Sequence, residues 1–357
     1  MAILVTGGAG YIGSHTVAEL VAHGESVVVV DNLSLGHRLA VQRVARALTD
    51  SGEIPLHMVD IRDAHALAEV FRQHEIEAVV HFAARSLVGE SVQVPLDYYE
   101  ANVWGTTVLV KMAVAHGVKS FVFSSSAATY GEPLHTPIHE EDPAIPTNPY
   151  GETKLAMERL LYWTYQAHGL QSISLRYFNA AGAHSDVHIG EDHHPETHLI
   201  PILLQVALGQ RQGVTVFGDD YPTLDGTCIR DYIHVMDLAA AHRLALVRLR
   251  GGKGKGASAT HHTMTETVNA PGAEVFNLGN GQGFSVQQVL TAARSVTGRE
   301  IPAIVGHRRP GDPAVLVASS DEARQVLGWK PQFVDLATIV ASAWHWHQAD
   351  PHGYGDN

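Results

Sequence analysis

The sequence predicts an α/β protein with a Rossmann-type, doubly wound parallel sheet and a smaller C-terminal α/β lobe. An apolar strand at 2–5 leads into glycines at positions 7, 10 and 13 and then into a helix. Strand and helix patterns alternate through the first half of the chain, which is typical of parallel βαβ units. The order becomes less regular after Gly182. We therefore divide the 357 residues into a first domain, 1–181, and a second lobe, 182–357, with some segments returning to the first domain.

The N-terminal glycines have the spacing of a dinucleotide-binding turn. Gly7, Gly10 and Gly13 let the backbone turn tightly, approach a pyrophosphate and pack the following helix against the sheet. The amides at the start of that helix then face an anion. A second apolar strand, 27–30, ends in Asp31, whose carboxylate can accept hydrogen bonds from a ribose diol. Asp31 would repel a 2′-phosphate, so the cofactor expected here is NAD rather than NADP.

The remaining elements follow from hydrophobic periodicity and from turn residues. In the first domain the sequence predicts strands at 54–59, 78–82, 120–126 and 173–177 and helices at 63–73, 96–116 and 150–168. In the smaller lobe it predicts a strand at 214–217 and helices at 237–249, 285–297 and 335–348. Turn residues and histidines over 182–201 predict a loop over a site. Glycine-rich residues 251–272 predict a mobile surface loop.

Composition argues against several classes of function. A net charge of −13 disfavours a nucleic-acid-binding or membrane-binding surface. One cysteine, Cys228, excludes an internal disulfide and suits a reducing cytoplasm. No apolar run approaches the roughly 20 residues of a membrane span, and no signal-peptide pattern is present. We therefore expect a cytoplasmic enzyme with no nucleic-acid or membrane partner.

Histidine clusters are the main competing signal, and they predict no metal site. The chain has 24 histidines, so pairs such as His193-His194, His261-His262 and His345/His347 are expected without any function. No His-Glu-x-x-His helix and no paired cysteines accompany them.

Tyr150 and Lys154 form the predicted catalytic centre. They lie four residues apart at the start of a predicted helix, so their side chains share one helix face and the ammonium should favour the phenolate. The strand at 120–126 ends in three serines. Ser126, at its carboxyl end, can hydrogen-bond a substrate hydroxyl beside Tyr150.

These motifs together resemble the extended branch of the short-chain dehydrogenase/reductase superfamily, most closely its UDP-glucose 4-epimerase family. The similarity covers Thr6 to Gly13, Ser124 to Ser126 and the Tyr150/Lys154 pair. It continues through 88–91, 176–179, 230–235 and 308–312. The resemblance implies a tightly held NAD, a UDP-hexose substrate in a cleft between the lobes, and a homodimer formed through helices that include the one bearing Tyr150.

The resemblance also assigns binding residues. Those implied for NAD, besides the three glycines, are Tyr11, Ile12, Asp31, Asn32, Asp60, Ile61, Phe82, Ala83, Ala84, Tyr150, Lys154 and Phe178. Those implied for the UDP-sugar are Ser126, Tyr150, Asn179, His198, Leu199, Val216, Phe217, Arg230, Arg309 and Asp312. Guanidinium groups suit phosphate oxygens, and an aspartate suits ribose hydroxyls. Arg230-Asp231 has a second interpretation, as a structural ion pair.

The chain departs from the family pattern at four places. Ser86, preceded by Arg85, stands where a lysine is usual. Ala101, followed by Asn102, and His198 stand where asparagines are usual. The loop at 251–272 is longer than expected. Leu316, near the position that gates the sugar pocket, leaves open whether UDP-N-acetylhexosamines or UDP-pentoses are accepted.

The implied activity is an NAD-dependent UDP-sugar 4-epimerase. Tyr150 would take the 4-hydroxyl proton while C4 gives hydride to NAD, and the 4-keto sugar would turn and receive the hydride on its other face. Two alternatives are weighed against it. A nucleotide-sugar 4,6-dehydratase needs an Asp-Glu pair after the serine strand, where this chain has Ala127 and Ala128. A non-catalytic NAD-binding regulator would have no use for Tyr150, Lys154 and Ser126.

Overall fold

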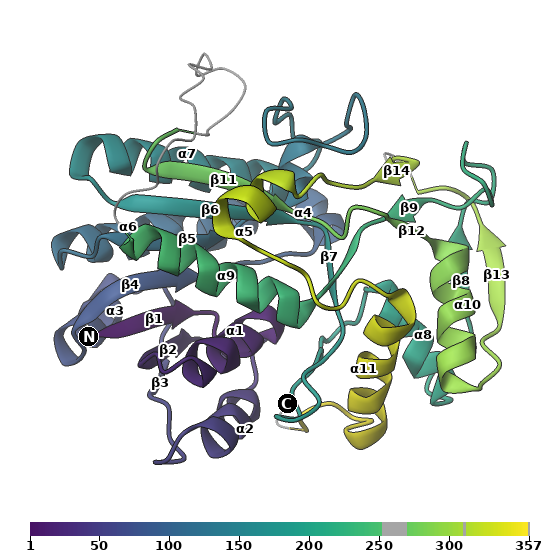
Figure 1. Ribbon diagram of the computed structural model, residues 1–357, viewed down its shortest axis with the longest axis horizontal. Helices are drawn as coiled ribbons and strands as arrows, with labels where there is room; N and C mark the ends of the chain where they lie inside the picture. Colours follow the sequence, from purple (N-terminus) through teal and green to yellow (C-terminus); the bar gives the residue numbers. More distant parts are fainter. Residues whose placement is uncertain (252–269, 310–311, 356–357) are drawn as a thin grey trace.

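The computed structural model describes residues 1–251, 270–309 and 312–355 (Figure 1). Most of the predicted mobile loop at 251–272 lies outside the described residues, and so do His261 and His262. Within the described part, none of the helices combines the length and the apolar character needed to cross a bilayer.

The predicted Rossmann-type fold is confirmed by a seven-stranded sheet in which every pair of neighbouring strands is parallel. Its order is β11-β6-β5-β4-β1-β2-β3. Val27 to Val30 form a continuous buried run, because a parallel sheet is covered on both faces. The strands are β1 (Ala2–Thr6), β2 (Val27–Asp31), β3 (Leu56–Met58), β4 (Ile76–His81), β5 (Ser120–Ser124), β6 (Gln171–Tyr177) and β11 (Ala273–Leu278).

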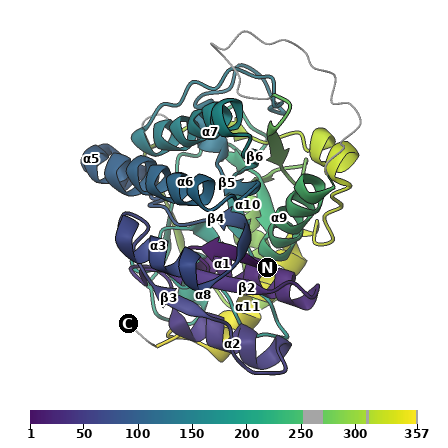
Figure 2. The same cartoon turned by 90° about the vertical axis from the view of Figure 1, so that its left-hand side faces the viewer.

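Helices cover both faces of this sheet, and Figure 2 shows α6 and α9 on opposite sides of it. One layer contains α1 (Tyr11–Ala22), α2 (Arg38–Leu48) and α9 (Val235–Arg250), which share an apolar core with the sheet. The other contains α3 (Ala64–Gln73), α6 (Gly105–Ala115) and α7 (Pro149–His168). The carboxyl ends of the strands, where ligands of such folds bind, carry the predicted site residues.

The predicted helix at 96–116 is divided in the structure. Pro95 begins the short α5 (Pro95–Tyr98), the π-helical turn η1 (Tyr99–Trp104) follows, and α6 then runs regularly. The preceding helix, α4 (Val88–Gln93), was outside the sequence prediction. Apolar periodicity alone does not distinguish a π turn from an α-helical turn. The apolar spacing over 96–116 therefore does not predict this division.

Among the described residues, three small sheets and three helices form the smaller lobe. Its sheets pair β7 (Asn179–Ala181) with β10 (Tyr232–His234), β8 (Val214–Phe217) with β13 (Ala303–Gly306), and β9 (Ile229–Arg230) with both β12 (Phe284–Ser285) and β14 (Val315–Leu316). The helices α8 (Leu199–Ala207), α10 (Val286–Thr297) and α11 (Leu336–Ala349) share one apolar core. Two short turns complete the elements, η2 (Ala127–Tyr130) and η3 (Ala323–Leu327).

Placing the helix at 237–249 in the smaller lobe is wrong. The structure packs it, as α9, on the large sheet, where Leu238, Ala241 and Ala245 are buried in the same core as α1. After it, β11 joins the edge of the sheet beside β6. Periodicity shows that a helix has an apolar face but not which neighbour that face contacts.

Candidate active site

The glycine turn brings β1, α1 and the end of β4 into close contact. Gly7 has φ of +71°, and a Cβ there would lie 2.6 Å from the Ala83 nitrogen. A Cβ on Gly13 would lie 2.0 Å from the Gly7 carbonyl oxygen. Within this described segment, Gly10 caps α1 without a side chain, and the first turn carries no acidic residue. The amides at the start of α1 are thus suited to an anion such as a pyrophosphate.

Asp31 ends β2 and shapes this turn. Its carboxylate accepts hydrogen bonds from the Ala9 amide at 3.0 Å and the Leu33 amide at 2.8 Å. Burial raises the pKa of Asp31, while these amides act in the opposite direction. Each carboxylate oxygen has a second lone pair, so the residue fits the predicted ribose contact while it also supports the loop.

The other residues predicted for the cofactor lie at the ends of neighbouring strands. The Asn32 side chain donates to Asp60 at 3.1 Å, and hydrogen bonds from Arg62 lower the pKa of Asp60 to about 2. The amides of Phe82 and Ala83 both donate to the Thr6 carbonyl. The Tyr11 hydroxyl instead donates to the Gly182 carbonyl at 2.7 Å, which ties the glycine turn to the segment after β7. Ile12 packs against the core beneath the turn, Ile61 is buried beside Gly105, and Ala84 follows Ala83 in the loop after β4.

Ser126, Tyr150 and Lys154 gather at the carboxyl end of β5. Ser126 caps η2, with its hydroxyl accepting from the Ala128 amide at 3.1 Å. Asn148 caps α7, and Tyr150 lies in the first turn of that helix. A Cβ on Gly151 would lie 2.4 Å from the Ala128 carbonyl oxygen. The start of α7 therefore lies directly against η2, which places Tyr150 near Ser126.

Burial controls the protonation of this centre. The pKa of Tyr150 is raised by burial, and a hydrogen bond with the Ser126 side chain acts in the opposite direction. Burial lowers the pKa of Lys154 to about 7, against the charge of Glu158. Lys154 Nζ donates to the Ser124 carbonyl at 2.7 Å and lies 5.8 Å from the centre of the Tyr150 ring. Burial of Tyr150 thus acts against the phenolate that the spacing predicts Lys154 to favour.

A buried polar network links α7 to β6 and to the end of β5, and the sequence did not indicate it. Glu158 accepts hydrogen bonds from the Ser125 hydroxyl at 2.5 Å and from Arg176 Nε at 2.9 Å. The Arg176 guanidinium lies 4.7 Å from the centre of the Tyr130 ring. Glu158 follows Lys154 by four residues, so the helical spacing that linked Tyr150 to Lys154 could also have indicated Glu158.

Residues predicted for the nucleotide end of the substrate also meet in the structure. Arg230 forms an ion pair with Asp312. Arg309 lies 3.3 Å from the same carboxylate and 5.0 Å from the centre of the Phe217 ring. Arg230 and Asp231 are not an ion pair, because Asp231 is buried and accepts from the Asn280 and Ala318 amides. These two arginines, one acid and one aromatic ring suit a nucleoside diphosphate.

The other residues predicted for the substrate, and Phe178, which is predicted for the cofactor, have partners of their own. The Asn179 side chain donates to the Asp231 carbonyl at 3.0 Å. Phe178 packs with Leu316 against a small core beside Tyr130. On β8 the Val216 side chain is buried, whereas Phe217 is exposed. Leu199 is the first residue of α8, and His198, its cap, lies 2.7 Å from Glu191.

The structure gives Asn102 and Arg85 specific partners. Asn102 accepts from the Arg85 amide at 2.8 Å and donates to the Arg85 carbonyl at 3.0 Å and to the Thr153 hydroxyl at 3.0 Å. The Arg85 guanidinium lies 3.7 Å from Glu90 and 3.6 Å from Asp97. Asn102 thereby fixes the loop that carries Ala83 and Ala84 against α7.

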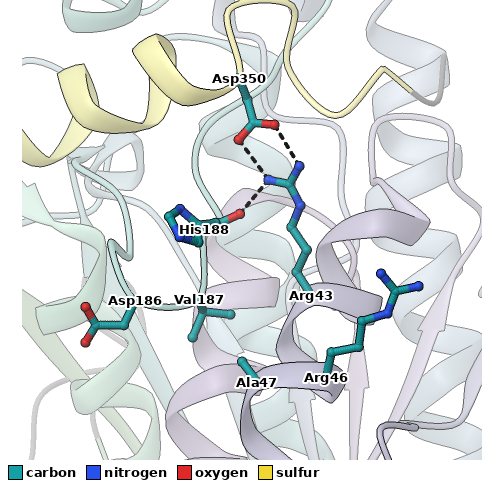
Figure 3. A pocket seen from close by; sticks show the side chains of 7 residues that line it. All are labelled: Arg43, Arg46, Ala47, Asp186, Val187, His188 and Asp350. Carbon is teal, nitrogen blue, oxygen red and sulfur yellow. Dashed lines mark hydrogen bonds and ion pairs between the residues drawn. The ribbon is translucent and has the colours of Figure 1, made fainter.

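A separate pocket is lined by residues of α2, of the segment after β7 and of the C-terminal region (Figure 3). Arg43 donates to Asp350 at 2.9 and 2.7 Å and to the His188 carbonyl at 2.7 Å. Its lining is separate from the predicted site residues and consists of Arg43, Arg46, Ala47, Asp186, Val187, His188 and Asp350.

The fold and these residues define a dinucleotide-binding enzyme of the sugar-nucleotide epimerase and dehydratase class. A family model described as GDP-mannose 4,6 dehydratase matches residues 4–342. A UDP-glucose 4-epimerase of Halalkalibacterium halodurans is 56% identical over 354 residues, covering 99% of this chain and 98% of the relative. A crystal structure of a UDP-glucose 4-epimerase has a TM-score of 0.89 at 52% identity, covering 99% of both chains.

A third comparison includes ligands. The UDP-glucose 4-epimerase of Bifidobacterium longum, solved in complex with NAD⁺ and UDP, has a TM-score of 0.88 at 38% identity and covers 99% of this chain and 100% of its own. The chain therefore belongs to the NAD-dependent epimerase/dehydratase family, and within it to the UDP-glucose 4-epimerases. The resemblance inferred from the sequence motifs is confirmed.

Proposed function

We propose that this protein interconverts UDP-galactose and UDP-glucose through a transient 4-keto sugar, with NAD as cofactor. The observation that carries this proposal is the meeting of Ser126, Tyr150 and Lys154 at the carboxyl end of β5, in the same sheet as the strand β1 that leads into the glycine turn. The relatives that match over nearly the whole chain are UDP-glucose 4-epimerases, and several of their structures contain NAD.

Tyr150 is proposed as the acid and base at the sugar 4-hydroxyl. When bound, NAD supplies the hydride acceptor and, in its oxidised form, a positive charge. Added positive charge favours the phenolate over the neutral phenol that burial otherwise favours. The phenolate then accepts the 4-hydroxyl proton, Ser126 holds the same hydroxyl by a hydrogen bond, and Tyr150 returns the proton at the end of the cycle.

The proposed cofactor residues offer hydrogen-bond donors and acceptors that suit a dinucleotide. The amides of the glycine turn suit the pyrophosphate, and the Asp31 carboxylate suits a ribose diol. The proposed set is that of the sequence analysis: Gly7, Gly10, Tyr11, Ile12, Gly13, Asp31, Asn32, Asp60, Ile61, Phe82, Ala83, Ala84, Tyr150, Lys154 and Phe178.

The UDP group is proposed to lie against Phe217, Arg230, Arg309 and Asp312, with Asn179, His198, Leu199 and Val216 nearby. Contacts to this remote part of the substrate retain the 4-keto sugar while leaving the hexose free to turn. Arg230 and Arg309 share Asp312, so their guanidinium groups are held together for the diphosphate.

A 4,6-dehydratase is the weaker candidate. Removing water from the sugar requires a second acid and base, and Ala127 and Ala128 occupy η2 directly after Ser126. Methyl groups transfer no protons.

We further propose a cytoplasmic homodimer. Exposed apolar side chains gather on α4 to α7, among them Leu96 at 82%, Trp104 at 50% and Trp163 at 55%. Figure 2 shows α5, α6 and α7 together on one side of the molecule, and these helices contact one another. A second copy would cover this surface. The single cysteine, Cys228, is free and buried, as suits a reducing compartment.

The deciding experiment incubates purified protein with UDP-galactose and no added reductant, and follows UDP-glucose. We expect product, together with near-equal amounts of NAD and subunits on heat extraction. Folded, NAD-saturated protein that gives no product would contradict the proposal. Parallel reactions with UDP-N-acetylgalactosamine and UDP-xylose define the substrate range.

A further inference from the structure

Four side chains of the segment between β7 and α8 converge on one point. Glu191, His193, Glu196 and His198 each offer one ligand atom, and these atoms all lie within 4.8 Å of one another. His198 Nδ1 lies 2.7 Å from Glu191 and 3.3 Å from Glu196, and His193 Nδ1 lies 3.1 Å from Glu191. Two imidazole nitrogens and two carboxylates therefore face each other.

The central atoms of this cluster lie at ion-pair distance from one another, but they form no well-directed hydrogen bond among the described residues. Glu191 Oε1, His193 Nδ1 and His198 Nδ1 are buried at the atom level without one, although they lie at ion-pair distance from each other. The Glu191 residue as a whole is only 4% exposed. Burying such atoms without well-directed hydrogen bonds is costly. A cation at the centre would satisfy all three at once.

The surrounding chain holds two of these residues in place. The Glu191 carbonyl accepts from Trp346 Nε1 at 3.0 Å. Glu196 Oε1 accepts from the amides of Thr197 and His198, both at 2.7 Å. The side chains of His193 and His198 are 26% and 43% exposed, which leaves an entry path for an ion. Preformed ligand positions of this kind are what a metal site requires.

We propose that Glu191, His193, Glu196 and His198 bind a divalent cation of the zinc type in a structural site. Imidazole and carboxylate ligands suit Zn²⁺. Its bonds to them are about 2.0–2.2 Å long, so ligand atoms in a tetrahedral site lie roughly 3.3 Å apart. The ion pairs of the cluster span 2.7 to 3.9 Å, and all four ligand atoms lie within 4.8 Å of one another. The prediction of no metal relied on the absence of a helical His motif, whereas these ligands lie on an irregular segment.

The ion would connect the substrate lobe to the cofactor turn. His198 caps α8, which begins with Leu199, and the His193 ring lies 6.2 Å from the Tyr11 ring. Tyr11 follows Gly10 in the glycine turn. The bound ion thus fixes the segment between β7 and α8 against α1, and its effect is expected on stability first.

The first test measures metal in untagged protein, so that no affinity tag contributes ligands. We expect about one zinc per chain in the wild type and less than a tenth of that in His193→Gln and in Glu191→Gln. His57→Gln is the matched control, because His57 lies 2.8 Å from His74 in a histidine pair outside the cluster, and it should retain the zinc. Equal zinc content in wild type and both cluster variants would overturn the proposal.

The second test needs only the wild type and covers the case in which a variant fails to fold. Protein stripped with a chelator is titrated with Co²⁺ and then with Zn²⁺, with absorption and melting temperature recorded. We expect tetrahedral Co²⁺ bands that saturate at about one equivalent, loss of these bands on adding Zn²⁺, and a rise in melting temperature with either ion. If neither a saturable band nor a shift in melting temperature is observed, the cluster is an ion-pair network only.

Discussion

At the scale of single residues, the active site depends on how burial changes proton affinity. Burial raises the pKa of Tyr150 and lowers that of Lys154 to about 7. Both shifts favour the uncharged forms of these side chains. The spacing of Tyr150 and Lys154 could be predicted from the sequence, but the direction of these shifts could not, because desolvation depends on what packs around them.

Tyr150→Phe should remove the proposed acid and base while retaining the ring. We expect turnover to fall by at least about 10²-fold, with UDP affinity little changed, because only the proton-transferring hydroxyl is lost. Steady-state kinetics and UDP titration measure the two effects separately. Activity within a fewfold of the wild type would place the base elsewhere.

Lys154 should make the stability of NAD-stripped protein depend on pH. Its pKa falls from 10.5 to about 7 on folding, so between these values the unfolded chain binds a proton that the folded chain lacks. The free energy of unfolding should therefore rise from about pH 7 to about pH 9, by up to about 1.4 kcal/mol per unit. Urea unfolding of wild type and Lys154→Met gives the comparison. Identical slopes in the two proteins would refute this role for Lys154.

Asp31→Ala should weaken NAD retention and reduce discrimination against NADP, with UDP binding spared. The carboxylate is predicted to bind the ribose diol and to repel a 2′-phosphate, and it also accepts from the Ala9 amide. Titration of NAD and NADP into stripped proteins measures both effects. Asp31→Asn serves as a control, because it retains an acceptor for the loop without the charge. Wild-type protein that binds both cofactors equally would exclude Asp31 as the selector.

At the scale of elements, α7 positions the chemistry by placing Tyr150, Lys154 and Glu158 at intervals of four residues. The existence of this helix is readily predicted from its apolar period and from Asn148 and Pro149 at its start. The buried partner of Glu158, Arg176, cannot be predicted from these patterns. Arg176 lies on β6 and reaches Glu158 only because the sheet brings β6 and α7 together.

Glu158→Gln should destabilise the protein strongly, because it leaves the Arg176 charge buried without its counter-ion. Both side chains are almost completely buried, and breaking such a pair costs about 3–5 kcal/mol. Denaturant unfolding of the NAD-loaded protein measures this loss. Glu158→Gln combined with Arg176→Met should recover part of the stability. A loss below about 1 kcal/mol in the single variant would show that the pair is solvated.

The segment between β7 and α8 shows the limit of element-level prediction. The polar residues over 182–201 predict a loop over a site, yet they do not show which of the histidines come together. The cluster forms because Glu191 is held by Trp346 of α11 and the Tyr11 hydroxyl is held by Gly182. Contacts between segments so distant in the chain have no local sequence pattern.

At the scale of the whole molecule, the arrangement of the two lobes follows from a chain that crosses between them repeatedly. After β7 and α8 the chain returns as α9 and again as β11. The alternating pattern of the first half predicts the sheet, but β11, six residues long, lies outside that half. Its pairing with β6 in the folded protein identifies it as a strand of the large sheet. In the proposed binding mode, the nucleotide and sugar ends of the substrate would be held by different lobes.

The proposed homodimer would form through the outer surface of the first domain. Leu96 and Trp163 are exposed on α5 and α7, and a solvated apolar surface of this kind is stabilised by a second copy. Light scattering should give the mass of two 38.5 kDa chains for the wild type. Trp163→Asp combined with Leu96→Asp should give one chain, because charges buried in an apolar interface are costly. Leu224→Asp, at a fully exposed leucine of the smaller lobe, is the matched control and should remain dimeric. A monomeric wild type would contradict the homodimer. A double variant that still dimerises would place the interface elsewhere.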